Sequence, residues 1–146
     1  MVACCAAATL MAEEKVVWMT DLPKALEKAK AEKKMVLMEF TGSDWCPPCK
    51  ALHKNVMTSK EFETYAAKNY ILVELDFPNQ KPQTDELKKA NKELAKKYEI
   101  KGYPTVIVLS ADGKELTKQV GYGGPTGGAK PDEYIAKLEA DTKKKS

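Results

Sequence analysis

Two cysteines separated by two residues, Cys46 and Cys49, are the side chains of this sequence with the most evident chemistry. An apolar run of strand length ends shortly before them and apolar residues recur at helical offsets after them, so Cys46 is expected to open a helix. There, unsatisfied N–H groups and the helix dipole stabilise a thiolate and lower the thiol pKa. Cys49 lies one turn further on, within reach of a mixed disulfide on Cys46. The spacing predicts thiol–disulfide exchange, with Cys46 as the nucleophile and Cys49 as the resolving thiol.

The two residues between the cysteines, Pro47 and Pro48, suit the first turn of a helix, where their missing N–H groups have no intrahelical partner to lose. They also remove two donors that could stabilise the Cys46 thiolate. We therefore expect weaker thiolate stabilisation than a motif with histidine between its cysteines would provide, and a protein that is a better reductant.

A metal-binding alternative rests on His53, the single histidine, four residues after Cys49 on the same helix face. Two thiols and one imidazole leave a tetrahedral zinc site one ligand short. We therefore expect no metal site, and no cofactor beyond the Cys46–Cys49 disulfide itself. A metal chaperone remains the less favoured hypothesis, and it would require His53 and stoichiometric zinc or copper(I).

Periodicity and turn residues around the cysteines predict alternating helices and strands. Strands are expected at residues 35–40, 70–76, 104–109 and 115–120, with a short edge strand at 16–18. Helices are expected at 21–33 with Asp21 as N-cap, from Cys46 onward, and from a capping box of Thr58 and Glu61 to about 68. Two more are expected, one with an apolar face formed by Leu87, Ala90, Leu94 and Tyr98, and one from Pro131. The early alternation implies parallel strands and the late hairpin an antiparallel edge. The fold class is therefore α/β, a mixed β-sheet flanked by helices.

Size and charge restrict the function classes. The chain has 146 residues, 43% of them apolar, which suits a single domain with its own core. The net charge of +3 comes from scattered lysines, and there is no arginine to provide a bidentate fork for phosphate or guanine. We therefore expect no nucleic-acid partner.

Residues 1–12 carry no charge and are followed abruptly by Glu13 and Glu14. This pattern predicts a signal-like export segment at 1–12, with Ala12 at the cleavage point, and a domain at 13–146. The segment is too short to span a bilayer. Cys4 also weakly resembles a lipoprotein acylation site, so membrane association is expected only if it is lipidated. The alternative is a frayed apolar N-terminus. After cleavage, Cys46 and Cys49 would have only each other as partners.

Two segments carry a resemblance to the thioredoxin superfamily. Residues 45–50, Trp-Cys-Pro-Pro-Cys-Lys, and residues 98–105, Tyr-Glu-Ile-Lys-Gly-Tyr-Pro-Thr, resemble its signatures in order and spacing. The resemblance spans residues 16–142, and residues 40–46 are most similar to exported thioredoxin-like proteins and the periplasmic domains of thiol:disulfide interchange proteins. It implies a thioredoxin-like three-layer sandwich.

The same resemblance implies roles for residues near the cysteines. Pro104 would be a cis-proline packed against the sulfurs, Tyr103 would offer backbone groups to an extended substrate peptide, and Trp45 would shield the sulfur. The alternatives are a trans proline that begins a strand and a tryptophan that only packs.

Glu39 corresponds to a buried acid that the family keeps behind the second cysteine, although one extra residue separates it from Cys46. Burial would raise the pKa of Glu39 and let it act as a base for Cys49. The alternative is a strand-edge glutamate that points to solvent.

Together these observations predict a monomeric thiol:disulfide oxidoreductase that works outside the cytoplasm, in the bacterial periplasm, as a reductant or an isomerase. Its expected partners are protein thiols or disulfides and a protein that recharges its redox state. A partner-binding module with a structural disulfide is the alternative. The redox hypothesis requires that Cys46 can be reached by another protein.

Overall fold

The computed structural model describes residues 16–123 and 128–145. The expected export segment with Cys4, and part of the glycine-rich loop before the last helix, lie outside the described residues. In chain order the elements are β1 (Trp18–Met19), α1 (Leu22–Glu32), β2 (Met35–Thr41), α2 (Pro47–Leu52), the π-helical turn η1 (His53–Met57), α3 (Lys60–Asn69), β3 (Tyr70–Asp76), α4 (Asp85–Lys97), β4 (Thr105–Leu109), β5 (Glu115–Val120) and α5 (Pro131–Lys143). None of the described helices is long and apolar enough to cross a membrane.

The strands form one five-stranded sheet in the order β1-β3-β2-β4-β5. β3 is parallel to both β1 and β2, whereas β4 is antiparallel to β2 and to β5. This is the mixed sheet that the alternation of elements predicts. The expected edge strand is confirmed in β1, which covers Trp18–Met19 rather than residues 16–18.

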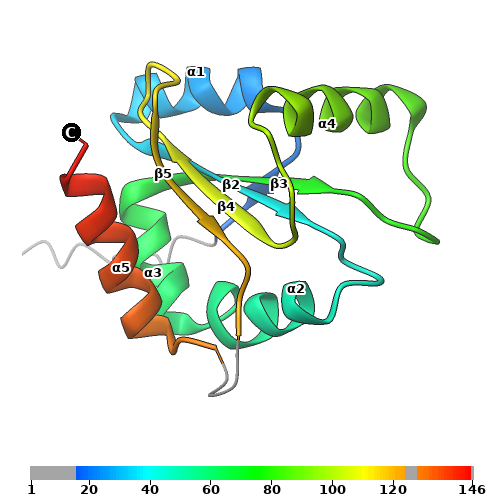
Figure 1. Cartoon of the computed structure of the whole chain (residues 1–146). Helices are drawn as coiled ribbons and strands as arrows, with labels where there is room; N and C mark the ends of the chain where they lie inside the picture. Colours follow the sequence, from blue (N-terminus) through cyan, green and yellow to red (C-terminus); the bar gives the residue numbers. More distant parts are fainter. Residues whose placement is uncertain (1–15, 124–127, 146) are drawn as a thin grey trace, which may run out of the picture.

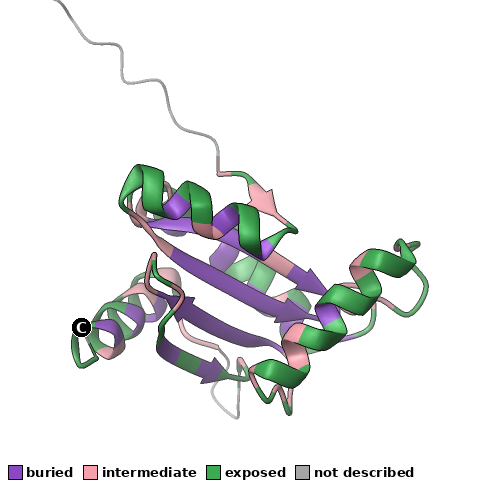
Figure 2. Ribbon diagram, turned by 90° about the horizontal axis from the view of Figure 1, so that it is seen from above, coloured by how far each residue is buried: buried purple, intermediate pink, exposed green. Residues whose placement is uncertain are grey.

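Helices cover both faces of the sheet, which gives three layers (Figure 1). One face carries α2, α3 and α5, and its core includes Leu37, Leu72, Phe62 and Leu138. The other face carries α1 and α4, and its core includes Phe40. Figure 2 looks onto this second face, where the strands beneath the helices are buried. The fold confirms the α/β sandwich expected from the sequence.

Two local predictions about helices are wrong. α3 is capped by Ser59, whose hydroxyl accepts from the Phe62 N–H at 3.2 Å, whereas the Thr58 hydroxyl donates to the carbonyl of His53. Ser59 has the extended backbone of an N-cap, with φ −71° and ψ 148°, whereas Thr58 ends η1 with φ −99° and ψ 4°, so Ser59 caps α3. On α4, Ala90 is exposed and the buried residue is Asn91, whose side-chain amide donates to the Asp76 carbonyl at 3.1 Å.

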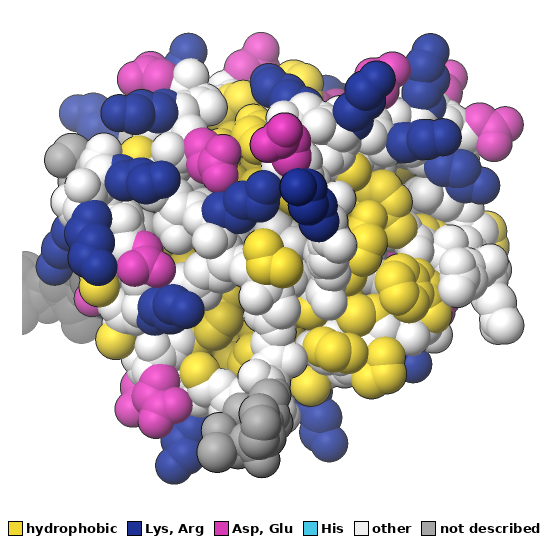
Figure 3. Space-filling view, in the orientation of Figure 1, with side chains coloured by type: hydrophobic (Ala, Val, Ile, Leu, Met, Phe, Trp, Pro, Cys, Tyr) yellow, Lys and Arg dark blue, Asp and Glu magenta, His cyan; other side chains and the backbone are white. Residues whose placement is uncertain are grey.

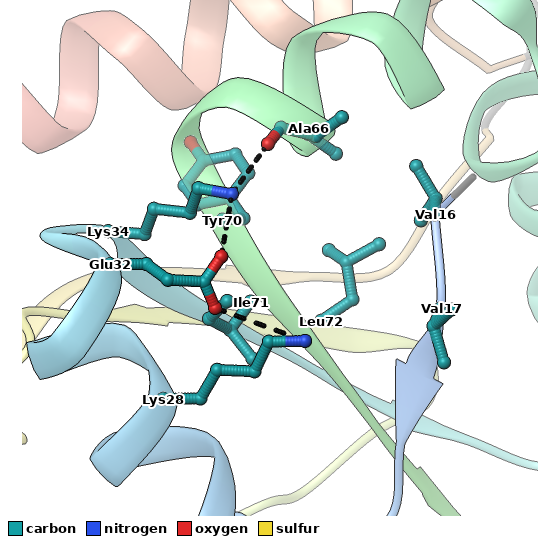
Figure 4. Close-up of a pocket in the computed structure, with 10 residues that line it drawn as sticks. Val16, Val17, Lys28, Glu32, Lys34, Ala66, Tyr70, Ile71 and Leu72 are labelled. Carbon is teal, nitrogen blue, oxygen red and sulfur yellow. Dashed lines mark hydrogen bonds and ion pairs between the residues drawn. The ribbon is translucent and has the colours of Figure 1, made fainter. Parts of the chain in front are cut away.

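A cavity of about 340 Å³ lies far from the cysteines, at the amino end of β3 (Figure 4). Lys34 donates to the carbonyl of Ala67 at 2.8 Å and pairs with Glu32, which also pairs with Lys28 at 3.9 Å. Cys46 instead follows the carboxyl end of β2. The cavity is therefore not part of the site described next.

Candidate active site

Cys46 occupies the N-cap position of α2, as the sequence predicts. Its backbone is extended, with φ −100° and ψ 105°, and its sulfur accepts from the N–H of Cys49 at 3.4 Å. Pro47 and Pro48 fill the first positions of the helix and offer no N–H groups. Cys46 and Cys49 form a disulfide. The arrangement can hold a thiolate on Cys46 at the positive end of the helix.

Both cysteines lie just beneath the surface. Cys46 is 3% exposed and Cys49 is 1% exposed, although the flanking Trp45 is 41% exposed and both prolines are exposed. Cys46 is therefore less accessible in this structure than the redox hypothesis requires of a nucleophile that reacts with another protein. Its neighbours in the chain are exposed, and another protein can reach the sulfur only if nearby side chains move.

Tyr103 and Pro104 lie beside the disulfide. The peptide bond between them is cis, and the Tyr103 carbonyl oxygen lies 3.7 Å from the Cys46 sulfur. The Tyr103 ring meets the Trp45 indole edge-on, with centroids 5.8 Å apart. The structure thus brings three residues that the sequence singled out, Trp45, Tyr103 and Pro104, together around Cys46.

Glu39 is buried in the sheet behind α2. It lies two residues after Leu37, so its side chain points to the sheet face that carries α2, α3 and α5. Glu39 is 2% exposed, and the alternative of a solvent-facing strand-edge glutamate is therefore wrong. Burial, followed by the negative charges of Glu74 and Asp76, raises the pKa of Glu39 to about 8. A carboxyl with this pKa can take up a proton near neutral pH.

Glu74 is a neighbour of Glu39 that the sequence hypotheses missed. The two are direct partners in the parallel pairing of β2 with β3. Glu74 is half-buried, and burial also raises its pKa. This chain therefore places a second carboxyl beside Glu39. A signal in the sequence could have found this pair, because each glutamate is the fifth residue of its strand. With Met35 paired to Tyr70, the two glutamates are aligned.

The loop after β3 is tied to the cysteine segment. The Asp44 carboxylate accepts three backbone N–H groups, from Asn79 at 2.9 Å, Gln80 at 2.8 Å and Lys81 at 3.0 Å. These bonds lower the pKa of Asp44 to about 2. The Ser43 hydroxyl donates to the Asp76 carboxylate at 2.5 Å. These bonds hold the two segments together.

Phe77, in that loop, was also missed by the sequence hypotheses. Its carbonyl accepts from the Trp45 indole N–H at 2.7 Å, and its ring lies 5.4 Å from the ring of Tyr103. No local signal in the sequence could have found this contact, because Trp45 and Phe77 are 32 residues apart.

His53 is exposed at the start of η1. Within residues 16–123 and 128–145, no group of three or more His, Cys, Asp or Glu side chains is placed to hold a metal ion. The structure therefore adds no observation in favour of the metal chaperone.

Known proteins resemble this chain over most of its length. Residues 22–140 match the family model of the thioredoxin-like domain. The disulfide bond reductase DsbH of Chlamydia pneumoniae is 35% identical over 120 residues, which are 82% of this chain and 69% of that protein. The thioredoxin-related protein DsbJ of the same organism is 30% identical over 88% of this chain, but the match covers only 37% of that protein. A solved structure of a DsbH oxidoreductase superposes with a TM-score of 0.77 at 32% identity, covering 89% of this chain and 86% of the other.

Proposed function

Because this chain belongs to the thioredoxin-like domain family, we propose that it is a thiol:disulfide oxidoreductase that reduces protein disulfides through Cys46 and Cys49. The observation that carries the proposal is the position of Cys46, which caps α2, bonds to Cys49 and lies 3.7 Å from the Tyr103 carbonyl oxygen. A purely structural disulfide has no need of a helix N-terminus, where a thiolate is stabilised.

The reaction begins with the dithiol form. The Cys46 thiolate attacks one sulfur of a client disulfide, a Cys46–client bond forms, and the other client sulfur leaves as a thiolate that takes a proton from solvent. Cys49 then loses its proton and attacks the Cys46 sulfur, which releases the second client thiolate. The products are a client dithiol and the Cys46–Cys49 disulfide. A recharging protein dithiol must supply two electrons and two protons to close the cycle.

Glu39 is proposed as the base that takes the proton from Cys49. It lies on the sheet face that α2 covers, and its pKa of about 8 suits exchange with a thiol near neutral pH. Glu39 is buried, so a proton held there is kept from bulk water.

Trp45, Tyr103 and Pro104 are proposed as the client-binding residues. The Tyr103 carbonyl beside the sulfur is a main-chain group at the edge of the site. An extended client segment can pair with such groups regardless of its sequence. Cys46 is 3% exposed, so binding must also move the side chains that cover its sulfur.

Reduction is favoured over isomerisation as the direction. The Cys49 N–H is the donor to the Cys46 sulfur, and the two prolines provide none, so the thiolate is only modestly stabilised. The relative DsbH carries the name disulfide bond reductase. An isomerase would act on scrambled disulfides without a supply of reductant, which separates the two activities in an assay.

We further propose that the protein works as a monomer outside the cytoplasm, in the bacterial periplasm, with protein disulfides as clients. This follows from the export segment expected at residues 1–12. N-terminal sequencing of the protein recovered from a periplasmic fraction, compared with a variant in which Ala12 is replaced by arginine, tests both location and cleavage.

Trapping of mixed disulfides tests the oxidoreductase function. The Cys49→Ser variant should accumulate clients on Cys46 that dithiothreitol releases, whereas Cys46→Ser should trap none. In the reduced protein, Cys46 should react with iodoacetamide before Cys49. If the wild-type disulfide resists mild dithiol and Cys49→Ser traps nothing, the protein is a binding module with a structural disulfide. Stoichiometric zinc or copper(I) in the reduced protein, lost in His53→Ala, would instead indicate a metal chaperone.

A further inference from the structure

Three aromatic side chains, Trp45, Tyr103 and Phe77, lie next to one another beside the disulfide and are called the aromatic row. The ring centroid of Tyr103 lies 5.8 Å from that of Trp45 and 5.4 Å from that of Phe77. The carbonyl of Tyr103 lies beside the Cys46 sulfur. The row therefore connects the surroundings of the reactive bond with the loop after β3.

The aromatic row is partly open to solvent. Trp45 is 41% exposed, and Tyr103 and Phe77 are half-buried, each with one side packed against the core beneath α1 and α4. Figure 3 shows hydrophobic side chains gathered between the amino end of α2 and α4. Single exposed apolar residues are ordinary, but contiguous ones at a reactive site indicate a contact surface.

The backbone of Phe77 is held independently of its ring. Its N–H donates to the Thr41 carbonyl at 2.9 Å, and its carbonyl accepts from the Trp45 indole at 2.7 Å. The Asp44 carboxylate fixes the next turn of the loop through its three backbone bonds. Neither the loop position nor the Trp45 hydrogen bond therefore depends on an aromatic side chain at residue 77.

We propose that Phe77 is a specificity-determining residue, which together with Tyr103 binds an apolar client side chain two residues from the cysteine that bonds to Cys46. The inference rests on the proposed function. In an extended client segment, side chains two positions apart point the same way and lie about 7 Å apart. A client cysteine at Cys46 therefore places the second side chain along the aromatic row. Clients with leucine or an aromatic residue at that position should be preferred.

The test compares three disulfide substrates. Two are disulfide-linked peptides that are identical except at the residues two positions before and two positions after the cysteine. These residues are leucine in one peptide and serine in the other. The third is glutathione disulfide, which is too small to reach Phe77. Initial rates of reduction give kcat and KM for wild type, Phe77→Ala, Phe77→Leu and Asp44→Asn. Val17→Ala is the matched control, because Val17 is 69% exposed near the opposite end of β3.

Wild type should favour the leucine peptide by about tenfold in kcat/KM, the discrimination typical of a small apolar contact. Phe77→Ala should remove most of that preference through KM and leave glutathione disulfide unaffected. Phe77→Leu should retain the preference, Asp44→Asn should weaken it because the loop is held less firmly, and Val17→Ala should not change it.

Two results would overturn this inference but not the proposed function. In the first, the wild-type protein reduces both peptides equally well. In the second, Phe77→Ala lowers the rate of reduction of all three substrates by the same factor, as replacement of a merely structural residue would. Wild type that reduces none of the three would overturn the proposed function as well. Phe77→Ala also removes contacts of the Phe77 ring with the core and could fail to fold. In that case Phe77→Leu and Asp44→Asn still test the inference.

Discussion

The buried carboxyl of Glu39 should make the stability of the protein fall as pH rises, and Glu39→Gln should abolish that fall. In the unfolded chain the pKa of Glu39 has its ordinary value of 4.5, whereas burial raises it to about 8 in the folded protein. At a pH between these two pKa values, Glu39 holds a proton in the folded protein that it has lost in the unfolded chain. Unfolding therefore releases a proton, and rising pH favours unfolding.

The size of the effect follows from the interval between the two pKa values. A single proton of difference changes the free energy of unfolding by about 1.4 kcal/mol per pH unit. From pH 4.5 to pH 8 the contribution of Glu39 should therefore decrease stability by about 5 kcal/mol in total. Glutamine carries no titrating proton. Any cost of burying its amide is the same at every pH, so it cannot produce a slope.

The assay is urea unfolding of the oxidised protein from pH 4.5 to pH 9, because neither Cys46 nor Cys49 titrates while they are bonded. The difference in unfolding free energy between Glu39→Gln and wild type should grow with pH and level off above pH 8. Glu93→Gln, at an exposed position on α4, is the matched control and should follow wild type. Parallel curves for Glu39→Gln and wild type would refute the buried, protonated carboxyl.

Four further outcomes are expected. Glu74→Gln removes a negative charge beside Glu39, which should lower the folded pKa of Glu39 and therefore the pH at which the fall in stability levels off in the same unfolding series. Glu39→Gln should slow release of client from the Cys46 mixed disulfide by about 100-fold or more at pH 8, as removal of a general base does, and rapid quenching with acid would measure this rate. A Cβ at residue 42 would overlap the indole of Trp45, so Gly42→Ala should cost roughly 1–3 kcal/mol of unfolding free energy. Equilibration with glutathione should place the Cys46–Cys49 potential on the reducing side of about −200 mV, and a value near −120 mV would contradict the modest stabilisation of the thiolate.

The sequence predicts the helices and strands well where the signal is local. Asp21 caps α1 as predicted, its carboxylate accepting from the Lys24 N–H at 3.1 Å, and Tyr70–Asp76 is the predicted strand without change. The error at α3 arises where two local signals compete. Thr58 and Ser59 can each cap a helix, and the π-helical turn decides between them because Thr58 ends that turn.

Apolar spacing predicted the face of α4 but not every residue on it. Leu94 and Tyr98 pack against the core as expected, whereas Ala90 is exposed and Asn91 is buried. It turns inward because the Asp76 carbonyl at the end of β3 needs a donor. A buried backbone acceptor favours such a partner over a small methyl group.

By itself, the sequence determined the features that depend on near neighbours: the order of helices and strands, and the pair of cysteines one turn apart at the start of a helix. Tertiary structure alone decided what surrounds them. The register of β2 with β3 sets Glu39 against Glu74, and the loop after β3 brings Phe77 to Trp45. The Tyr103 carbonyl reaches Cys46 from 57 residues away. Pairing between strands and packing of loops act between residues distant in the chain, so no local pattern of residue types records them.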